Sequence, residues 1–324
     1  MISRLGRLSV AFIVLLCAAA APGAPARALE DIEMGTIGGP SAVLWPIYIA
    51  ISQGMFAAEN LNIKLTFVPS SAGVQQQLAA GALELSDAGL NDQVRAIFEG
   101  APIALVRLEG QAPPYALLSQ PAIKSIAELR GKTLMVGGEK DITRVYIARM
   151  LGHAGIKPGD YDLLYSGATI ARFAALQSGA VAAAILYPPF NFRAESAGYT
   201  NLGLVVDYLK DLPFSGFSVN TAWAAQKKDR VQKFLAAYTR AVAWFNDDSN
   251  RAEAIRMMVE VTRQPVEDTE KSYDLFRKID FFERKGAVSK KKVAEIVEIL
   301  RSDMRERPLD INRLFLPDVT QVTE

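Results

Sequence analysis

Strand patterns alternate with helical patterns along most of this chain. Glycine pairs close two of the strands, Gly38-Gly39 after the first and Gly137-Gly138 later on. Such alternation predicts an α/β fold in which helices cover the faces of mostly parallel sheets. The length of 324 residues is enough for two domains of about 150 residues each. The predicted strands are 32–37, 63–68, 83–88, 103–108, 115–119, 133–136, 161–165, 182–186 and 202–206.

After Pro213 the pattern changes. One more strand is expected at 217–219, and the rest of the chain is almost purely helical. Apolar residues at helical spacing run from Val231 to Phe245 and from Val293 to Leu300. We interpret both stripes as core faces, and Ser289 is placed to cap the second helix.

The first residues predict an export signal. Arg4 and Arg7 precede an apolar stretch at 8–21, and Ala26-Arg27-Ala28 is a small-x-small cleavage pattern. The stretch falls short of the roughly 20 residues that span a bilayer. We therefore expect cleavage after about Ala28 and a periplasmic mature protein.

Composition argues against several kinds of function. The chain has 36 Lys+Arg and 35 Asp+Glu, a net charge of +1, which gives no case for nucleic-acid binding. Its single Cys, Cys17, would leave with the signal, and its single His, His153, is expected at a helix end, where a cation is favoured. Neither a Gly-x-Ser-x-Gly elbow, a Walker loop nor a dinucleotide fingerprint is present. We expect no catalytic residue, metal or cofactor.

Several segments resemble a known family. They include Pro46-x-Tyr48-x-Ala50-x-x-x-Gly54, the loop 70–73, the segment 126–132 and the run from 176 to 189. In order and spacing, the chain from Gly35 to about residue 250 is similar to type II periplasmic solute-binding proteins. The group it resembles most is the NMT1/THI5-like group, which serves nitrate, sulfonate, taurine and pyrimidine-precursor ABC importers.

The resemblance implies a two-lobed architecture. Residues 29–108 and 208–265 would form the first lobe, 109–207 the second, and 266–324 helices packed on the first lobe. Hinges are expected near 108–110 and 207–208, so that the lobes close on a solute. The partners implied are a small solute and the permease subunits of an ABC importer, with the binding protein itself a monomer.

In open α/β sheets, ligands bind beyond the carboxyl ends of the strands. Applied to this chain, the rule selects residues at four strand–helix junctions and on the helices that follow. The candidate ligand-binding residues are Gly38, Trp45, Tyr48, Ser70, Ser71, Asn91, Asp92, Glu139, Asp141, Arg144, Arg172 and Tyr187.

The chemistry of these candidates leaves the solute open. A helix N-terminus after Ser70, or a clamp by Arg144 or Arg172, would suit a carboxylate or sulfonate. Asp92 disfavours an anion and suits an amino or ring N–H group. A purely structural role is the alternative for six of these candidates. It would be helix capping for Ser70, Ser71, Asn91 and Asp141, and core packing for Trp45 and Tyr48.

Three functions are consistent with these observations. The favoured one is a solute receptor for an ABC importer that binds a sulfonate, a carboxylate or an aromatic or heterocyclic compound. An exported enzyme on the same fold, acting on a small heterocycle or organosulfur compound, is the alternative. A receptor for a sensor kinase is the third.

Overall fold

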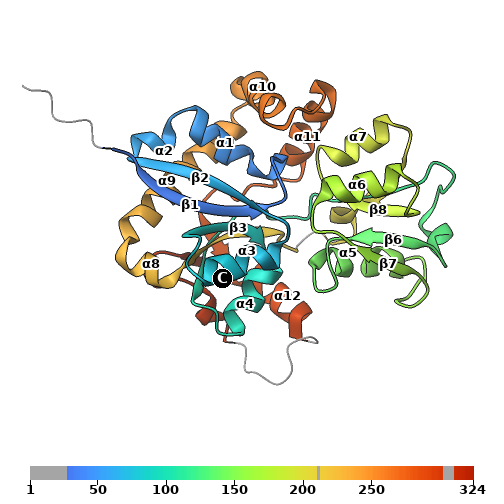
Figure 1. Cartoon of the computed structure of the whole chain (residues 1–324), viewed down its shortest axis with the longest axis horizontal. Coiled ribbons are helices and arrows are strands. Elements are labelled where there is room, and N and C mark those ends of the chain that lie inside the picture. Colours follow the sequence, from blue (N-terminus) through green and yellow to red (C-terminus); the bar gives the residue numbers. More distant parts are fainter. Residues whose placement is uncertain (1–27, 210–211, 302–309) are drawn as a thin grey trace, which may run out of the picture.

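The computed structural model describes residues 28–209, 212–301 and 310–324. The predicted signal, apart from Ala28, lies outside the described residues. Figure 1 shows two lobes side by side, each built around one sheet with helices on its faces. Within the described ranges, no helix combines the length and apolar character needed to cross a membrane.

The first lobe contains a five-stranded sheet in the order β2-β1-β3-β10-β4. β10 runs antiparallel to both β3 and β4, whereas the other four strands run in one direction. The strands are β1 Glu30–Ile37, β2 Leu61–Val68, β3 Leu85–Gly89, β4 Ile103–Leu108 and β10 Ser215–Asn220. Its helices are α1 Trp45–Ser52, α2 Met55–Ala58, α3 Ser71–Ala79, α4 Leu90–Phe98, α8 Thr221–Gln226 and α9 Lys228–Asn246.

The second lobe contains a five-stranded sheet in the order β7-β6-β8-β5-β9. Here β5 is the one strand that runs against its neighbours. The strands are β5 Ala116–Ser119, β6 Thr133–Val136, β7 Asp162–Tyr165, β8 Ala183–Leu186 and β9 Thr200–Leu204. The helices are α5 Ile142–Gly152, α6 Thr169–Gln177 and α7 Phe190–Ser196. Both sheets are thus mixed, with one reversed strand each in an otherwise parallel set.

Most predicted elements appear close to their expected bounds. The strands 103–108 and 133–136 have the bounds the sequence predicts. The strand predicted at 202–206 is shifted, since β9 ends at Leu204 and Val205–Asp207 forms a 3-10 helix. Two segments connect the lobes, one before β5 and one after β9. The Val205 amide in the second segment donates to the Tyr115 carbonyl in the first, and this hydrogen bond turns the chain away from the sheet.

The C-terminal part adds α10 Arg251–Thr262, α11 Val266–Lys278, β11 Ala287–Ser289, α12 Lys290–Arg301 and β12 Gln321–Thr323. We expected this part to pack on the first lobe; α11 in addition reaches α7 of the second lobe. There the Ser196 hydroxyl donates to Asp268 Oδ1 at 3.1 Å. Ser289 caps α12 as expected, because its Oγ accepts from the Lys292 amide at 3.3 Å.

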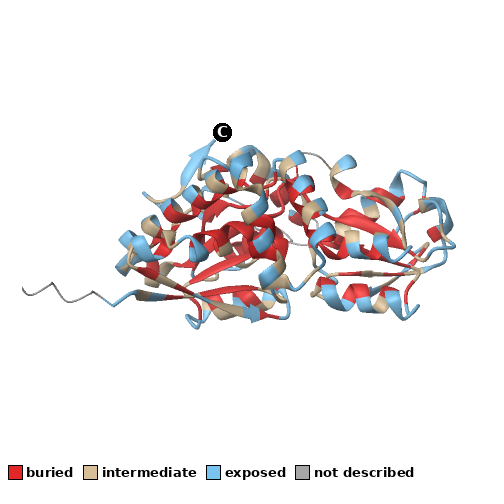
Figure 2. Ribbon diagram, turned by 90° about the horizontal axis from the view of Figure 1, so that it is seen from above, coloured by how far each residue is buried: buried red, intermediate tan, exposed pale blue. Residues whose placement is uncertain are grey.

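The buried residues lie inside both lobes and beneath the C-terminal helices (Figure 2). The two connections between the lobes are themselves paired. The Gly110 amide donates to the Ser215 carbonyl, and the Phe214 amide donates to the Gly110 carbonyl at 2.8 Å. Gly110 also lies under the Phe281 ring, where a Cβ atom would come within 2.7 Å of the ring edge. The connections therefore meet at one well-packed point.

Candidate ligand-binding cleft

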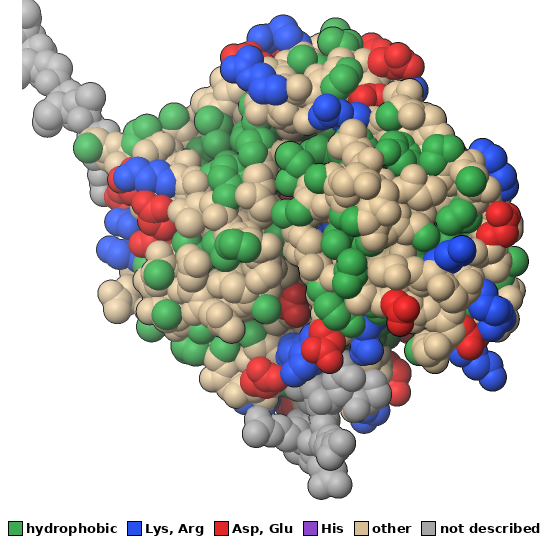
Figure 3. Space-filling model, turned by 45° about the vertical axis from the view of Figure 1, so that its right-hand side comes forward, with side chains coloured by type: hydrophobic (Ala, Val, Ile, Leu, Met, Phe, Trp, Pro, Cys, Tyr) green, Lys and Arg blue, Asp and Glu red, His purple; other side chains and the backbone are tan. Residues whose placement is uncertain are grey.

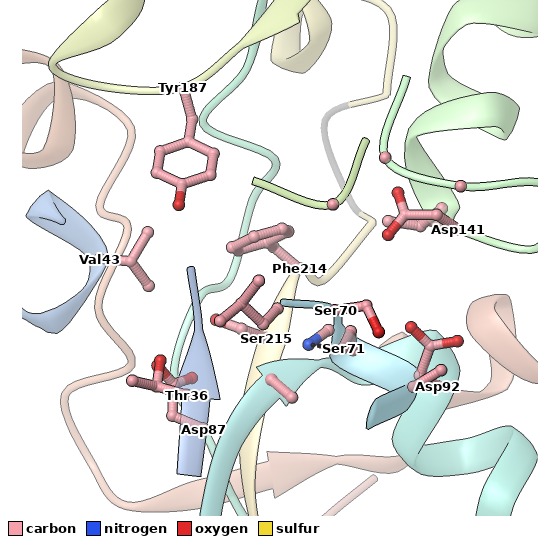
Figure 4. Close-up of a pocket in the computed structure, with 18 of the residues that line it drawn as sticks. Thr36, Val43, Ser70, Ser71, Asp87, Asp92, Asp141, Tyr187, Phe214 and Ser215 are labelled. Atoms are coloured by element: carbon pink, nitrogen blue, oxygen red, sulfur yellow. Dashed lines mark hydrogen bonds between the residues drawn. The ribbon is translucent and has the colours of Figure 1, made fainter. Parts of the chain in front are cut away.

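A cavity of about 220 Å³ lies between the two lobes. Figure 3 shows the groove between them, with an acidic side chain inside it, and Figure 4 shows the side chains around the cavity. The first lobe contributes Thr36, Ile37, Ser41, Val43, Ser70, Ser71, Ala72, Asp87, Ala88, Gly89 and Asp92. The second contributes Gly137, Gly138, Glu139, Lys140, Asp141, Ile142, Gly167, Arg172 and Tyr187. The connections between the lobes add Tyr115 and Phe214, and Ser215 begins β10.

Three aromatic rings form one wall of this cavity. The Tyr115 ring lies edge-to-face with Tyr187 at 5.3 Å and with Phe214 at 5.4 Å between centroids. Burial raises the pKa of both tyrosines, so their hydroxyls stay neutral. Tyr187 follows β8, and its hydroxyl is hydrogen-bonded to Ser41 of the first lobe. The wall offers a flat apolar surface of the kind that aromatic rings pack against.

Carboxylates from both lobes occupy another side of the cavity. Asp92 lies in the first turn of α4, and Asp141 caps the N-terminus of α5 by accepting from the Thr143 amide at 2.9 Å. Figure 4 shows their carboxyl groups pointing toward one another. Burial, and then the charge of Asp141, raise the pKa of Asp92 to about 7, although a hydrogen bond to Ser71 opposes this.

A second carboxyl pair lies deeper. Asp87, near the end of β3, is 3% exposed and accepts from the Thr36 hydroxyl at 3.3 Å. Burial raises the pKa of Asp87 to about 6, and a hydrogen bond joins its carboxyl to that of Glu109. Burial and the charge of Asp87 raise the pKa of Glu109, whose oxygens accept from Ser215 at 2.8 Å and Tyr238 at 3.2 Å. The two carboxyls therefore share a proton.

Sequence reasoning missed Asp87 as a cavity residue. The signal was an acid inside a predicted strand that is otherwise suited to a core. Asp87 also lies next to Ala88 and Gly89, at the carboxyl end of β3. The rule that ligands bind beyond the carboxyl ends of strands, called the strand-end rule below, predicts ligand contacts at this position.

Arg172 lines the cavity but has too few free donors for a bidentate clamp. A guanidinium has five N–H donors. Four of them bond the carbonyls of Ile185, Ser166 and Gly167 and the hydroxyl of Thr169, at 2.5–2.9 Å. The expected bidentate clamp is therefore not available, because Arg172 binds the ends of β8 and of the loop before α6 instead.

Ser70 and Ser71 line the cavity as expected, and both hydroxyls also serve the fold. Ser70 Oγ caps α3 by accepting from the Gly73 amide at 3.1 Å. Ser71 Oγ accepts from the Gly89 amide at 3.2 Å. Glu139, on the loop before α5, lines the cavity as well.

Trp45 and Tyr48 do not line the cavity. Trp45 is fully buried, and its Nε1 donates to the Ala254 carbonyl at 2.9 Å. Its ring packs against Phe245 at 5.4 Å between centroids, so this residue joins α1 to the C-terminal helices. Tyr48 is half-buried in the same helix, and its hydroxyl has no hydrogen-bond partner among the described residues.

Gly38, Asn91 and Arg144 are also outside the cavity lining. Gly38 adopts a φ of 74°, which suits glycine, and turns the chain after β1. Asn91 Nδ2 donates across the cleft to the Lys140 carbonyl at 3.3 Å. Arg144 is half-buried on α5, beside Tyr161 on one side and, with Asn91 and Asp141, at a neighbouring small cavity on the other. The structure thus brings seven of the twelve predicted residues to the cavity: Ser70, Ser71, Asp92, Glu139, Asp141, Arg172 and Tyr187.

His153 is the C-terminal cap residue of α5, as the sequence predicts. Its ring packs edge-on against Tyr208 at 5.1 Å between centroids. The described cavity lining contains neither histidine nor cysteine.

Two lobes, each with a mixed sheet, and a cleft between them define the periplasmic-binding-protein fold. Comparison with known proteins places the chain further: it belongs to the NMT1/THI5-like family, whose model matches residues 41–252. No curated protein matches the chain in sequence.

Solved structures share the fold at low sequence identity. The alkanesulfonate-binding protein SsuA from Xanthomonas axonopodis pv. citri, bound to MOPS, has a TM-score of 0.72 at 16% identity and covers 90% of this chain and 98% of its own. The nitrate-binding protein NrtA from Synechocystis PCC 6803 has a TM-score of 0.63 at 16% identity over 74% and 69% of the two chains. A DszB variant in complex with biphenyl-2-sulfinic acid has a TM-score of 0.63 at 12% identity over 90% and 98%.

Proposed function

We propose that this protein is an extracytoplasmic solute receptor that closes its two lobes around one small organic molecule. The observation that carries this proposal is the cavity itself, because both lobes and both connections contribute to its lining. A solute held there contacts every part that moves when the lobes separate, so its binding energy stabilises the closed form.

The finer assignment is delivery of the solute to the permease of an ABC importer. It is supported by family membership and by the likeness of the fold to the sulfonate- and nitrate-binding proteins named above. Export through the predicted N-terminal signal, a periplasmic location and a monomeric state belong to the same proposal.

Native mass spectrometry of the freshly purified protein tests the proposal, because a receptor of this kind retains its solute. We expect one bound small molecule per chain. After removal of that molecule by unfolding and refolding, its return should raise the melting temperature and reduce the radius of gyration. A ligand-free protein whose scattering no solute changes would contradict the proposal.

The alternative is an exported enzyme on the same fold, for which the DszB likeness is the one specific observation. Incubation of the retained molecule with the protein distinguishes the two, since a receptor returns it unchanged and an enzyme converts it.

A further inference from the structure

We propose that the bound solute is a flat aromatic cation, with its positive group between Asp92 and Asp141 and its ring on the wall formed by Tyr115, Tyr187 and Phe214. This inference rests on the proposed receptor function and specifies the chemistry of its solute. A carboxylate, sulfonate or nitrate is then the wrong charge for this cleft.

The first step is the placement of the two acids. Asp92 belongs to the first lobe and Asp141 to the second, and their carboxyl groups point toward one another across the cavity (Figure 4). Closing the lobes therefore brings two negative groups together in a partly dry space, where repulsion is poorly screened. A cation between them turns this cost into attraction, so the solute's charge decides whether the closed form is favourable.

Two of the helix N-termini at the cleft do not offset these acids. Asp92 lies in the first turn of α4 and Asp141 caps α5, so each acid already neutralises the positive end of its own helix. An anionic solute at either helix end would have to compete with the protein's own carboxylate.

Two positive side chains line the cavity. Four of the five N–H donors of Arg172 bond protein acceptors. Lys140 is an exposed residue that stands between Glu139 and Asp141 in sequence. Its carbonyl, in contrast, accepts from Asn91 and Arg95 across the cleft, at 3.3 Å each.

Asp87 places a further acid at the cavity. The residue lines the cavity at 3% exposure, and its carboxyl is hydrogen-bonded to that of Glu109. A pair of carboxyls that shares one proton keeps one negative charge. An N–H group on the far side of the solute would meet that charge.

The aromatic wall completes the assignment. Figure 4 shows Tyr187 on the side of the cavity away from Asp92 and Asp141, and Phe214 between. The Tyr115 ring packs edge-to-face against both of these rings. A planar ring with a cationic substituent fits both sides at once, with its ring on the wall and its charge between the acids.

The test compares four compounds that share one phenyl ring: benzamidine (cation), benzamide (neutral), benzoate and benzenesulfonate (anions). Isothermal titration calorimetry with the stripped full-length protein gives affinities, and small-angle scattering reports closure. We expect benzamidine to bind about tenfold or more tightly than benzamide, and the anions to give no heat. Only benzamidine should reduce the radius of gyration.

Three variants locate the charge. Asp92→Asn and Asp141→Asn keep side-chain shape, and asparagine still caps α5. Each should weaken benzamidine about tenfold and change benzamide less than threefold. Glu99→Gln, an exposed acid at the end of α4, is the matched control and should change neither.

The possible failures differ in meaning. Closure around benzoate or benzenesulfonate, no binding of benzamidine, or benzamidine binding that both Asn variants leave intact would each overturn the cation inference. The first result would leave the receptor function standing. A protein that neither retains a molecule on purification nor closes with any of the four compounds would contradict both proposals.

Discussion

Gly167 of the second lobe lies directly against the carbonyl oxygen of Pro69 in the first. A Cβ atom on Gly167 would lie 2.4 Å from that oxygen, so only glycine permits this contact. Together with the hydrogen bond from Asn91 to the Lys140 carbonyl, it shows that the lobes touch around the cavity.

Gly167→Ala should therefore hold the lobes apart. The obstacle is backbone rather than a flexible side chain, so the closed form must shift by a fraction of an ångström or more, with loss of solute contacts. We expect about a tenfold loss of solute affinity, measured by calorimetry, and a larger radius of gyration with solute present. Gly152→Ala is the control, since a Cβ atom there meets nothing within 4 Å. Unchanged affinity in Gly167→Ala would show that the contact does not limit closure.

The acids at the cleft should make the ligand-free protein less stable as pH rises. The pKa of Asp92, about 7 when folded, lies above its usual value of 3.8. The folded state thus binds more protons than the unfolded state between these values, and stability is lost as pH rises through about 7. Around Asp92 are Asp141, Arg95 and Ser71, with Glu139 and Lys140 on the facing loop.

Asp92→Asn should accordingly raise the melting temperature of the ligand-free protein at pH 8 by about 3 °C or more. At pH 4 it should have little effect, because the native carboxyl is then protonated. Asp87 and Glu109 act in the same direction, so part of the slope remains in the variant. Equal slopes in Asp92→Asn and wild type, measured by calorimetric scans, would refute the assignment.

Arg172→Met should destabilise the second lobe. It leaves the buried carbonyls of Ile185, Ser166 and Gly167 without their donor. Loss of donors to buried acceptors costs about 1–3 kcal/mol for each group left unsatisfied, although water entry reduces the total. Urea unfolding should show a lower midpoint. Arg172→Lys should recover only part of it, since lysine cannot reproduce the planar set of donors.

Trp45→Phe tests whether Trp45 contributes to stability and not to solute binding. Because Trp45 packs against the C-terminal helices and not the cavity, we expect a loss of about 1–3 kcal/mol in unfolding free energy with unchanged solute affinity. A marked fall in affinity at unchanged stability would return Trp45 to the binding site.

The strand-end rule predicted the cavity better than residue type did. Ser70, Asp92 and Asp141 were found because each follows a strand or opens a helix, and these positions are set by local sequence. Trp45 also opens a helix, yet its ring points to Ala254, a partner 209 residues away. Local pattern carries no information about such a distant partner.

Arg172 shows a different limit. Its place in the first turn of α6 was predicted, but a helix can direct such a residue either to the cleft or to nearby carbonyls. The carbonyl acceptors of Ser166 and Gly167 decide the matter, and the pairing of β7 with β6 places the loop that carries them.

β10 has a consequence for synthesis. This strand fills the gap between β3 and β4, although the whole second lobe separates it from them in sequence. A chain cut after β9 would leave both of those strands with unpaired edges, a state prone to aggregation. The N-terminal lobe therefore cannot complete its sheet before the chain beyond the second lobe has been made and exported.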